Sequence, residues 1–208
     1  MTVRIDLNIS LDGVVVPTDP MGEDWGRITA AYTSTRTFRE RVLQDTTGSG
    51  TTGIDDRYAT EYFEAVGAEI MGAGMFGLHT YPDDPDWRGW WGEEPPFRCP
   101  VIVLTNRERP TIEFANGTRF EFVVATPEEA LARAREYAGD GDIRIGGGAS
   151  VARDFLRAGL VDRLHVAVAP IILGGGTRLW DDLPSLDRDY TVTSETAESG
   201  VVHVTFTR

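Results

Sequence analysis

Residues 142–160, DIRIGGGASVARDFLRAGL, place an extended apolar segment, three consecutive glycines and an amphipathic helical pattern in direct succession. Glycine has no Cβ, so backbone N–H groups at such a turn can approach an anion closely. Ser150 and the first amides of the following helix would face that anion with the positive end of the helix dipole. The segment therefore predicts either a phosphate-binding turn or a plain strand-to-helix connection. Gly159 is placed to close the helix in a left-handed conformation.

The rest of the chain alternates short apolar strands with helices. Helical patterns cover residues 27–44, 54–66 and 127–137, and a capping box of Thr126 and Glu129 opens the last of them. Strand patterns cover residues 3–9, 68–71, 101–104, 120–124, 143–145, 164–169, 190–196 and 201–206. The last two strands predict a terminal antiparallel hairpin. We expect an α/β three-layer sandwich with a mixed, mostly parallel sheet, in a single domain of residues 1–208.

Composition restricts the possible functions. A formal net charge of −13 repels a polyanionic backbone, and the basic residues do not cluster, so we expect no nucleic-acid partner. One cysteine, Cys99, and three histidines, His79, His165 and His203, show no metal-ligand spacing, so we expect no metal. No segment reaches the roughly 18 apolar residues of a membrane span, and the N-terminus lacks a secretory signal. We expect a cytoplasmic protein without membrane contact.

Polar or glycine-rich groups follow four of the predicted strands. These groups are residues 8–16, 72–75, 105–107 and 146–150. In open α/β sheets, ligands bind beyond the carboxyl ends of the strands, so the four groups together favour one extended ligand such as a dinucleotide. A Rossmann domain does not fit, because its glycines belong in the first βα unit and Val166, not an acid, stands twenty residues after Gly146. Any bound phosphate needs nearby arginines, for which Arg107, Arg109, Arg144 and Arg153 are candidates.

Four segments resemble a known family in their order and spacing. They are NISLDGVV (8–15), AEIMGAGMFG (68–77), VIVLTNRERP (101–110) and IRIGGGASVARDFLRAGLVDRLHVAVAPIILGGGTRLW (143–180). The pattern resembles the dihydrofolate reductase-like superfamily, closest to the bacterial branch that includes the C-terminal reductase domain of riboflavin biosynthesis. The resemblance covers nearly the whole chain.

This resemblance implies a reductase that uses NADPH to reduce a small, heterocyclic substrate, and relatives are commonly homodimers. The implied pyrophosphate-binding residues are Gly146, Gly147, Gly148, Ala149 and Ser150. Across the cofactor from these lie Gly72, Ala73, Gly74 and Met75, while Thr105, Asn106 and Arg107 face the adenosine. The residues near the nicotinamide are Asn8, Asp12 and Val15. The cofactor carries the hydride chemistry, and the protein mainly orients it.

Two departures from the family pattern affect the cofactor and the proton donor. Relatives commonly carry a basic side chain where this chain has Ala73, so Arg107 either binds the cofactor's 2′-phosphate or is a solvated loop arginine. Folate reductases place a buried carboxylate after the first loop, where this chain has Glu23 and Asp24. Asp24 is our candidate for a catalytic acid, and a helix-start role is its alternative. Folate is therefore not the expected substrate.

Other functions stay open. Reduction of the ribosylaminopyrimidine intermediate of riboflavin synthesis is one, although the absence of lysine counts against a phosphorylated substrate. A non-catalytic nucleotide-binding sensor is another, and a flavin enzyme is a third.

Several remaining features have structural interpretations. Trp87, Trp90 and Trp91 are expected to hold a long loop in place, and His165 and His203 to be structural. Asp55 and Asp56 stand where a helix begins and are expected to cap it. The second glycine triplet, residues 174–176, is expected to permit a β-bulge or close packing between subunits.

Overall fold

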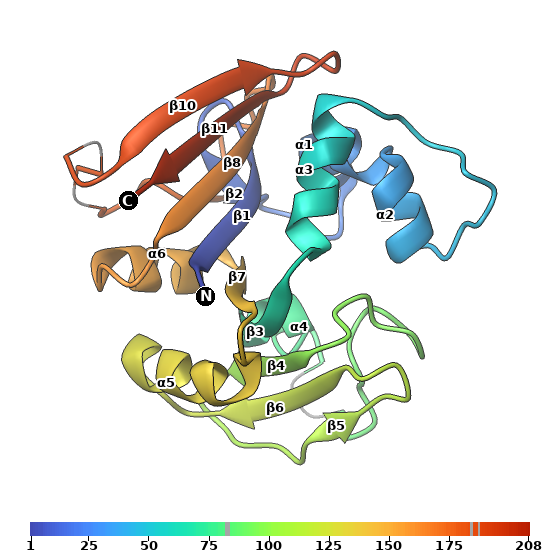
Figure 1. Cartoon of the computed structure of the whole chain (residues 1–208), viewed down its shortest axis with the longest axis vertical. Helices are drawn as coiled ribbons and strands as arrows, with labels where there is room; N and C mark the ends of the chain where they lie inside the picture. Colours follow the sequence, from blue (N-terminus) through green and yellow to red (C-terminus); the bar gives the residue numbers. More distant parts are fainter. Residues whose placement is uncertain (82–83, 184, 187) are drawn as a thin grey trace. The chain divides into compact units, whose positions relative to one another are not determined.

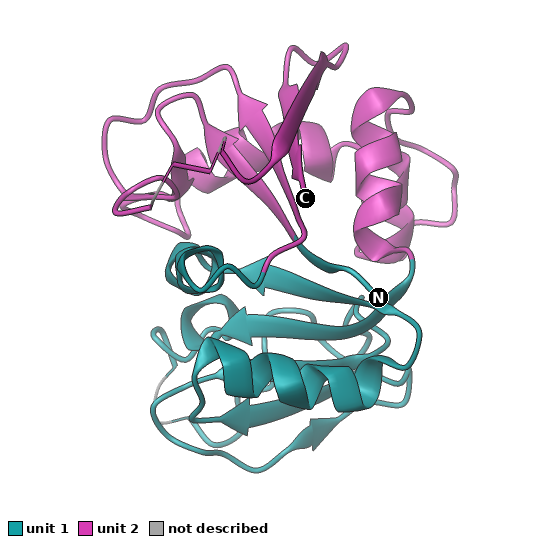
Figure 2. Ribbon diagram, turned by 60° about the vertical axis from the view of Figure 1, so that its left-hand side comes forward, with its two compact units in different colours: residues 1–4, 65–160 teal, residues 5–64, 161–208 magenta. Residues whose placement is uncertain are grey.

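The computed structural model describes residues 1–81, 84–183, 185–186 and 188–208. Within them the chain forms two compact units, each built from separate segments (Figure 2). Unit 1 contains Met1–Arg4 and Ala65–Leu160, and unit 2 contains Ile5–Glu64 and Val161–Arg208. The expectation that all 208 residues act as one domain stays a prediction.

Unit 1 is a parallel sheet with one short antiparallel edge strand (Figure 1). Its elements are β3 (Val66–Gly72), α4 (Ala73–Phe76), β4 (Pro100–Leu104), β5 (Ile112–Glu113), β6 (Arg119–Val123), α5 (Pro127–Ala138), β7 (Asp142–Gly147) and α6 (Ala149–Arg157). The strand order is β7-β3-β4-β6-β5, and only the β5–β6 pair is antiparallel. Parallel strands buried on both faces explain the continuous apolar runs in the sequence.

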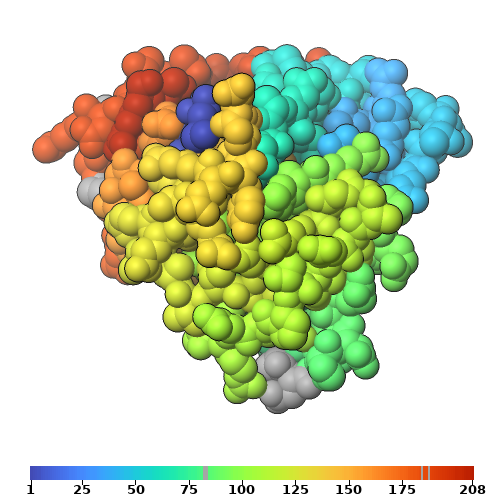
Figure 3. Space-filling view, turned by 60° about the horizontal axis from the view of Figure 1, so that its bottom comes forward, coloured from blue at the N-terminus to red at the C-terminus, as the bar shows by residue number. Residues whose placement is uncertain are grey.

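Helices cover both faces of this sheet. Two consecutive residues of β6 show this, because their side chains point to opposite sides and each contacts a different helix. Glu121 accepts hydrogen bonds from Arg133 and Tyr137 of α5 on one face. On the other face, the ring of Phe120 contacts the ring of Phe76 from α4, with centroids 5.0 Å apart. The predicted three-layer arrangement is therefore confirmed in unit 1. The outer side of α5 is exposed and appears in yellow in the space-filling view (Figure 3).

One core cluster of unit 1 lies on the α4 face of the sheet and is largely aromatic. Its buried members are Met71, Phe76, Leu78, Phe97, Cys99, Val101, Val103, Phe114, Phe120 and Phe122. Burial of this apolar surface stabilises the unit.

Unit 2 contains the antiparallel part of the fold. Its elements are β1 (Val3–Ser10), which begins in unit 1, β2 (Val14–Val16), α1 (Glu23–Thr33), α2 (Arg36–Arg41), α3 (Ile54–Phe63), β8 (Arg163–Ala169), β9 (Thr177–Arg178), β10 (Thr191–Thr196) and β11 (Val202–Thr207). The strand order is β10-β11-β8-β1, with β11 antiparallel to both of its neighbours. The predicted terminal hairpin is confirmed.

Local sequence signals predicted the start of α5 and the end of α6. The capping box of Thr126 and Glu129 is present at α5, and Gly159 has φ +68° just beyond α6, as predicted. The single helix predicted over residues 27–44 is wrong, because α1 ends before Thr35 and α2 begins after it. The Thr35 side chain accepts a hydrogen bond from the N–H of Phe38 and so caps a new helix.

Candidate nucleotide-binding site

The carboxyl ends of three parallel strands in unit 1 carry glycine-rich or polar segments. Residues 72–75 lie at the end of β3, residues 105–107 follow β4, and residues 146–150 run from β7 into α6. The strands β7, β3 and β4 are hydrogen-bonded neighbours in parallel register. The structure therefore brings these three predicted segments together along one edge of the unit 1 sheet.

The first turn of α6 is open to an anion. Gly148 is the N-cap, and the helix begins there without a side-chain cap. Gly147 has φ +124°, which favours glycine, and the peptide bond between Gly147 and Gly148 is cis. A Cβ built on Gly148 would meet no atom within 4 Å. Backbone N–H groups at this helix start can therefore approach a negatively charged ligand without a side chain between them.

Gly72 joins the end of β3 closely to the start of α6. A Cβ on Gly72 would lie 2.9 Å from Cγ2 of Val151 and 3.6 Å from the backbone nitrogen of Gly148. A residue larger than glycine at position 72 would push the two segments apart. Gly74 is exposed and Ala73 is partly exposed, so the first residues of α4 lie at the surface beside the glycine turn.

A cavity of about 360 Å³ lies beside this turn, entirely within unit 1. Its lining residues are Leu104, Thr105, Asn106, Val124, Ala125, Pro127, Val151, Asp154 and Phe155. Thr105 and Asn106 were predicted to face an adenosine, and they share the cavity with the same face of α6 that carries Val151. The volume falls within the range of roughly 300–1,000 Å³ that small-molecule pockets occupy.

The tryptophan-rich loop holds α4 in place, as predicted. Trp87 donates a hydrogen bond from Nε1 to the carbonyl oxygen of Phe76 at 2.9 Å, and Trp90 donates to that of Met75 at 3.0 Å. Trp91 stacks on Phe120 in the core. The short helix that follows Gly72 thus receives partners for its last carbonyl groups from the loop.

Arg144 cannot serve as a phosphate-binding residue, which corrects one sequence-based candidate. Its guanidinium forms an ion pair with Glu69 on the neighbouring strand, and both side chains are fully buried. Sequence reasoning missed this pair. The signal was available as a single charge within each of two apolar segments, AEIMG and IRIG, because buried charges need partners.

The residues predicted near the nicotinamide belong to unit 2. Asn8 lies on β1 and Val15 on β2, and both are partly exposed. The Asp12 carboxylate accepts hydrogen bonds from the Ser10 hydroxyl at 2.6 Å and from the backbone N–H of Gly174 at 2.9 Å. The Ser10 hydrogen bond is the largest cause that lowers the pKa of Asp12 well below its usual range. The Asp12 side chain therefore fastens two loops, and its place beside a nicotinamide stays a prediction.

Asp24 does not have the buried surroundings of a proton-donating acid in unit 2. It lies in the first turn of α1, its side chain is 47% exposed, and its Oδ1 accepts a hydrogen bond from Arg27 at 2.7 Å. This is the alternative helix-start role. The catalytic role of Asp24 receives no support from these contacts and stays a prediction.

The capping role expected of Asp55 and Asp56 is wrong. Both lie in the first turn of α3, but Asp55 Oδ1 is 2.9 Å from Nε2 of His203, and Asp56 accepts a hydrogen bond from the backbone N–H of Thr37. Their long-range partners come from other elements of unit 2, which local sequence does not reveal.

The second glycine triplet permits close packing inside the chain. Gly176 has φ +115°, and a Cβ there would collide with the backbone oxygen of Val16. The register between β2 and β9 shifts between Val14 and Val16 on β2, and a bulge at the triplet itself stays a prediction. Close packing between subunits stays a prediction.

The described residues contain neither a candidate metal site nor a candidate membrane-spanning helix. No group of three or more His, Cys, Asp or Glu side chains in that part of the chain is placed to hold a metal ion. None of its helices has both the length and the apolar character needed to cross a bilayer.

A mixed α/β sheet with helix-starting glycine turns at its strand ends defines a dihydrofolate reductase-like reductase fold. The chain belongs to the family described as RibD C-terminal domain, whose model matches residues 1–203. Members of this family are generally NAD(P)H-dependent oxidoreductases. The resemblance inferred from sequence is thereby confirmed.

Known proteins similar to this chain agree on the fold. A putative riboflavin biosynthesis protein from Shewanella sp. PV-4 has a TM-score of 0.61 at 20% identity, covering 100% of this chain and 99% of that one. A deaminase and 5-amino-6-(5-phosphoribosylamino)uracil reductase from Thermotoga maritima has a TM-score of 0.54 at 15% identity, covering 99% of this chain and 56% of that one. Dihydrofolate reductase from Enterococcus faecalis, complexed with NADP(H), has a TM-score of 0.50 at 16% identity, covering 100% and 96%.

One curated relative is similar in sequence over a shorter stretch. It is the uncharacterized protein YyaP of Bacillus subtilis strain 168, 35% identical over 65 residues. The match spans 31% of this chain and 35% of that protein.

Proposed function

We propose that this protein is an NADPH-dependent reductase that transfers a hydride to a small heterocyclic substrate. The observation that carries the proposal is the uncapped start of α6 at Gly148, which opens beside the cavity lined by Thr105 and Asn106. An anion site next to a pocket of this size suits the diphosphate and adenosine of a dinucleotide.

The residues at the sheet edge fit this cofactor chemically. A side chain at position 148 would occupy the open space in front of this residue. Glycine therefore keeps the backbone N–H groups at the helix start accessible. The N–H groups of Ala149 and Ser150 would bind diphosphate oxygens, and residues 72–75 would lie on the opposite side of the cofactor. The helix dipole of α6 adds a favourable field for the negative charge.

Arg107 is our proposed ligand of the 2′-phosphate that distinguishes NADPH from NADH. It is exposed immediately after Asn106, at the border of the cavity, and its backbone N–H donates a 3.3 Å hydrogen bond to Oγ1 of Thr105. Ala73 offers no charge at the position where relatives carry a basic residue. A guanidinium can bind a phosphate in bidentate geometry, so Arg107 can replace that charge.

When bound, the cofactor would supply the hydride, and the chain would supply position and exclusion of water. Asp12 would act by holding the loop after β1 in one conformation through the amides of Leu173 and Gly174. The acceptor is proposed to be a heterocycle without a phosphate group, because the chain contains no lysine and its net charge is −13. We propose that the active assembly is a homodimer.

The test is to follow NADPH binding and NADPH oxidation separately. Quenching of tryptophan fluorescence by NADPH, together with NADPH oxidation by one of a panel of pterins, pyrimidines, quinones and carbonyl compounds, would support the proposal. The panel includes the ribosylaminopyrimidine of riboflavin synthesis, whose exclusive reduction would replace our substrate class by that one. Binding without oxidation by any compound would favour a nucleotide sensor, and the absence of binding would refute both.

A further inference from the structure

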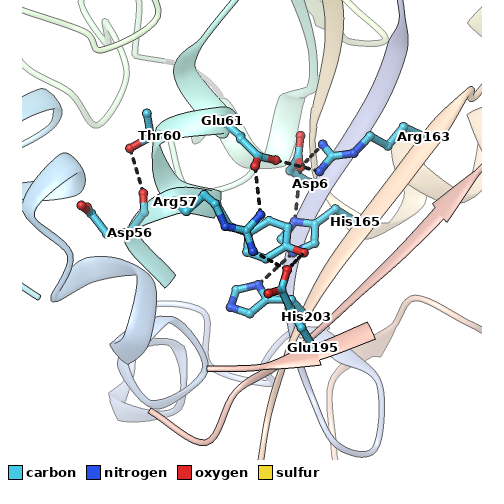
Figure 4. Close-up of polar contacts among 10 residues, drawn as sticks. Asp6, Asp56, Arg57, Thr60, Glu61, Arg163, His165, Glu195 and His203 are labelled. Carbon is cyan, nitrogen blue, oxygen red and sulfur yellow. Dashed lines mark hydrogen bonds and ion pairs between the residues drawn. The ribbon is translucent and has the colours of Figure 1, made fainter. Parts of the chain in front are cut away.

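Unit 2 contains a buried pair of histidines between two aspartates. His165 on β8 and His203 on β11 lie on one face of neighbouring antiparallel strands, with Nε2 of His165 3.0 Å from Nδ1 of His203. Asp55 on α3 lies 2.9 Å from Nε2 of His203, and Asp6 on β1 lies 3.3 Å from Nδ1 of His165. Figure 4 labels His165, His203 and Asp6 together with charged residues around them.

The rings are shielded from water by an aromatic lid. The Tyr58 ring from α3 is parallel to both imidazoles, with centroids 4.2 Å from His165 and 4.1 Å from His203. The histidine residues are 5% and 3% exposed. The guanidinium of Arg57 lies 4.5 Å from the centre of the Tyr58 ring. The protonation of the pair is therefore governed by fixed neighbours more than by solvent.

Counting protons on the four ring nitrogens constrains the charge of the pair. The central hydrogen bond between His165 and His203 holds one proton, because one nitrogen must donate and the other accept. Each outer nitrogen faces a carboxylate, Asp6 or Asp55, and is stabilised with a proton of its own. Three protons on four nitrogens is one more than two neutral imidazoles carry. With this proton count the pair would carry a single positive charge.

We propose that His165 and His203 form a binding site for one shared proton, which fastens α3 to β1, β8 and β11, and that adding a second proton or removing the shared one loosens α3. A second proton would place two N–H groups face to face and break the central hydrogen bond. Removing the shared proton would leave two lone pairs facing each other at the same place, or one carboxylate without its donor.

The charged groups around the pair come from every element packed against it. They are Asp6 on β1, Asp55, Arg57, Tyr58 and Glu61 on α3, Arg163 on β8, and Glu195 on β10. Arg163 links Asp6 to Glu61 at 3.4 and 3.0 Å, and Tyr58 donates to Glu195 at 2.7 Å. These contacts hold the two carboxylates and the aromatic lid in position around the imidazoles.

Burial lowers the pKa of His203; the Asp55 hydrogen bond opposes this shift, and the charge of His165 adds to it. A lowered pKa means that the unfolded chain binds the second proton more readily than the folded one. Stability is therefore lost as pH falls below about 6.5, the pKa of a free histidine. A shared proton that the folded state holds more tightly would have the opposite sign, because its contribution would be lost as pH rises.

The test uses the full chain labelled with ¹⁵N-histidine, which has only three histidines. At pH 7.5 the four nitrogens of His165 and His203 should together show one lone pair, and the signals of exposed His79 serve as the reference. Two lone pairs in the buried rings at pH 7.5 would overturn the proposal.

A second measurement follows unfolding by urea from pH 5 to 9. The unfolding equilibrium constant should pass through a minimum near neutral pH and rise on each side by up to tenfold per pH unit, one proton being exchanged. Asp55→Asn should flatten the profile, and His79→Gln should leave it unchanged. An Asp55→Asn profile that still follows the wild-type curve would also refute the shared proton, independently of any cofactor.

Discussion

Glu69 on β3 is paired with Arg144 on β7 inside unit 1, and the same carboxylate packs against Gly146. A Cβ built on Gly146 would collide with Oε1 of Glu69. The ion pair therefore lies directly behind the glycine turn that starts α6.

We expect Glu69→Gln to destabilise the protein strongly, because the change leaves the buried guanidinium of Arg144 without its counter-charge. Removing one partner of a buried pair typically costs about 3–5 kcal/mol. Urea unfolding measures the loss. Glu113→Gln is the matched control, since its side chain is 75% exposed, its partner Arg119 is 38% exposed, and the expected cost is below about 1 kcal/mol. Equal losses in the two variants would contradict a special role for the buried pair.

Gly148→Val should weaken NADPH binding by at least tenfold, or about 1.4 kcal/mol. The new side chain meets no protein atom at Cβ and would occupy the proposed diphosphate position. Gly147 is a poorer test, because its φ of +124° makes any side chain strained in the fold itself. Calorimetry on the folded variant gives the affinity. Gly26→Val on α1, also with open space at Cβ, controls for general effects, and undiminished affinity in Gly148→Val would remove the diphosphate assignment.

Arg107→Ala should weaken NADPH more than NADH. The guanidinium is proposed to bind the 2′-phosphate, which NADH lacks. Dissociation constants for both cofactors, measured in the wild type and the variant, provide the comparison. Arg135→Ala, an exposed arginine on α5, serves as the charge-matched control. Identical losses of affinity for the two cofactors would show that Arg107 does not recognise the 2′-phosphate and contributes only its positive charge.

Asp12→Asn should loosen the connection between the loop after β1 and residues 173–174. Asp12 accepts from the amides of Leu173 and Gly174, so these two amides should exchange with solvent faster in the variant. The Ser10 hydroxyl is the first cause of the lowered pKa of Asp12, so this contribution is present above about pH 4 and is lost on acidification. Hydrogen exchange followed by mass spectrometry measures the exchange rates of these two amides. Unchanged exchange in Asp12→Asn would show that the hydrogen bonds do not hold the loop.

The helix starts and ends of α5 and α6 follow from local chemistry and were accessible from sequence. Thr126 and Glu129 cap α5 through residues three apart, and Gly159 closes α6 because it tolerates positive φ. The break between α1 and α2 at Thr35 was missed, since apolar spacing over residues 27–44 is compatible with one helix.

The sequence by itself determined the order of the eight longer strands, the glycine turn at residues 146–150 and the family to which the chain belongs. These depend on residue type and short spacing, which act locally. Only the tertiary structure decided the partners of charged side chains. Arg144 turned out to pair with Glu69, and Asp55 with His203, because residues distant in sequence meet where strands and helices pack, and burial then obliges each charge to find a partner.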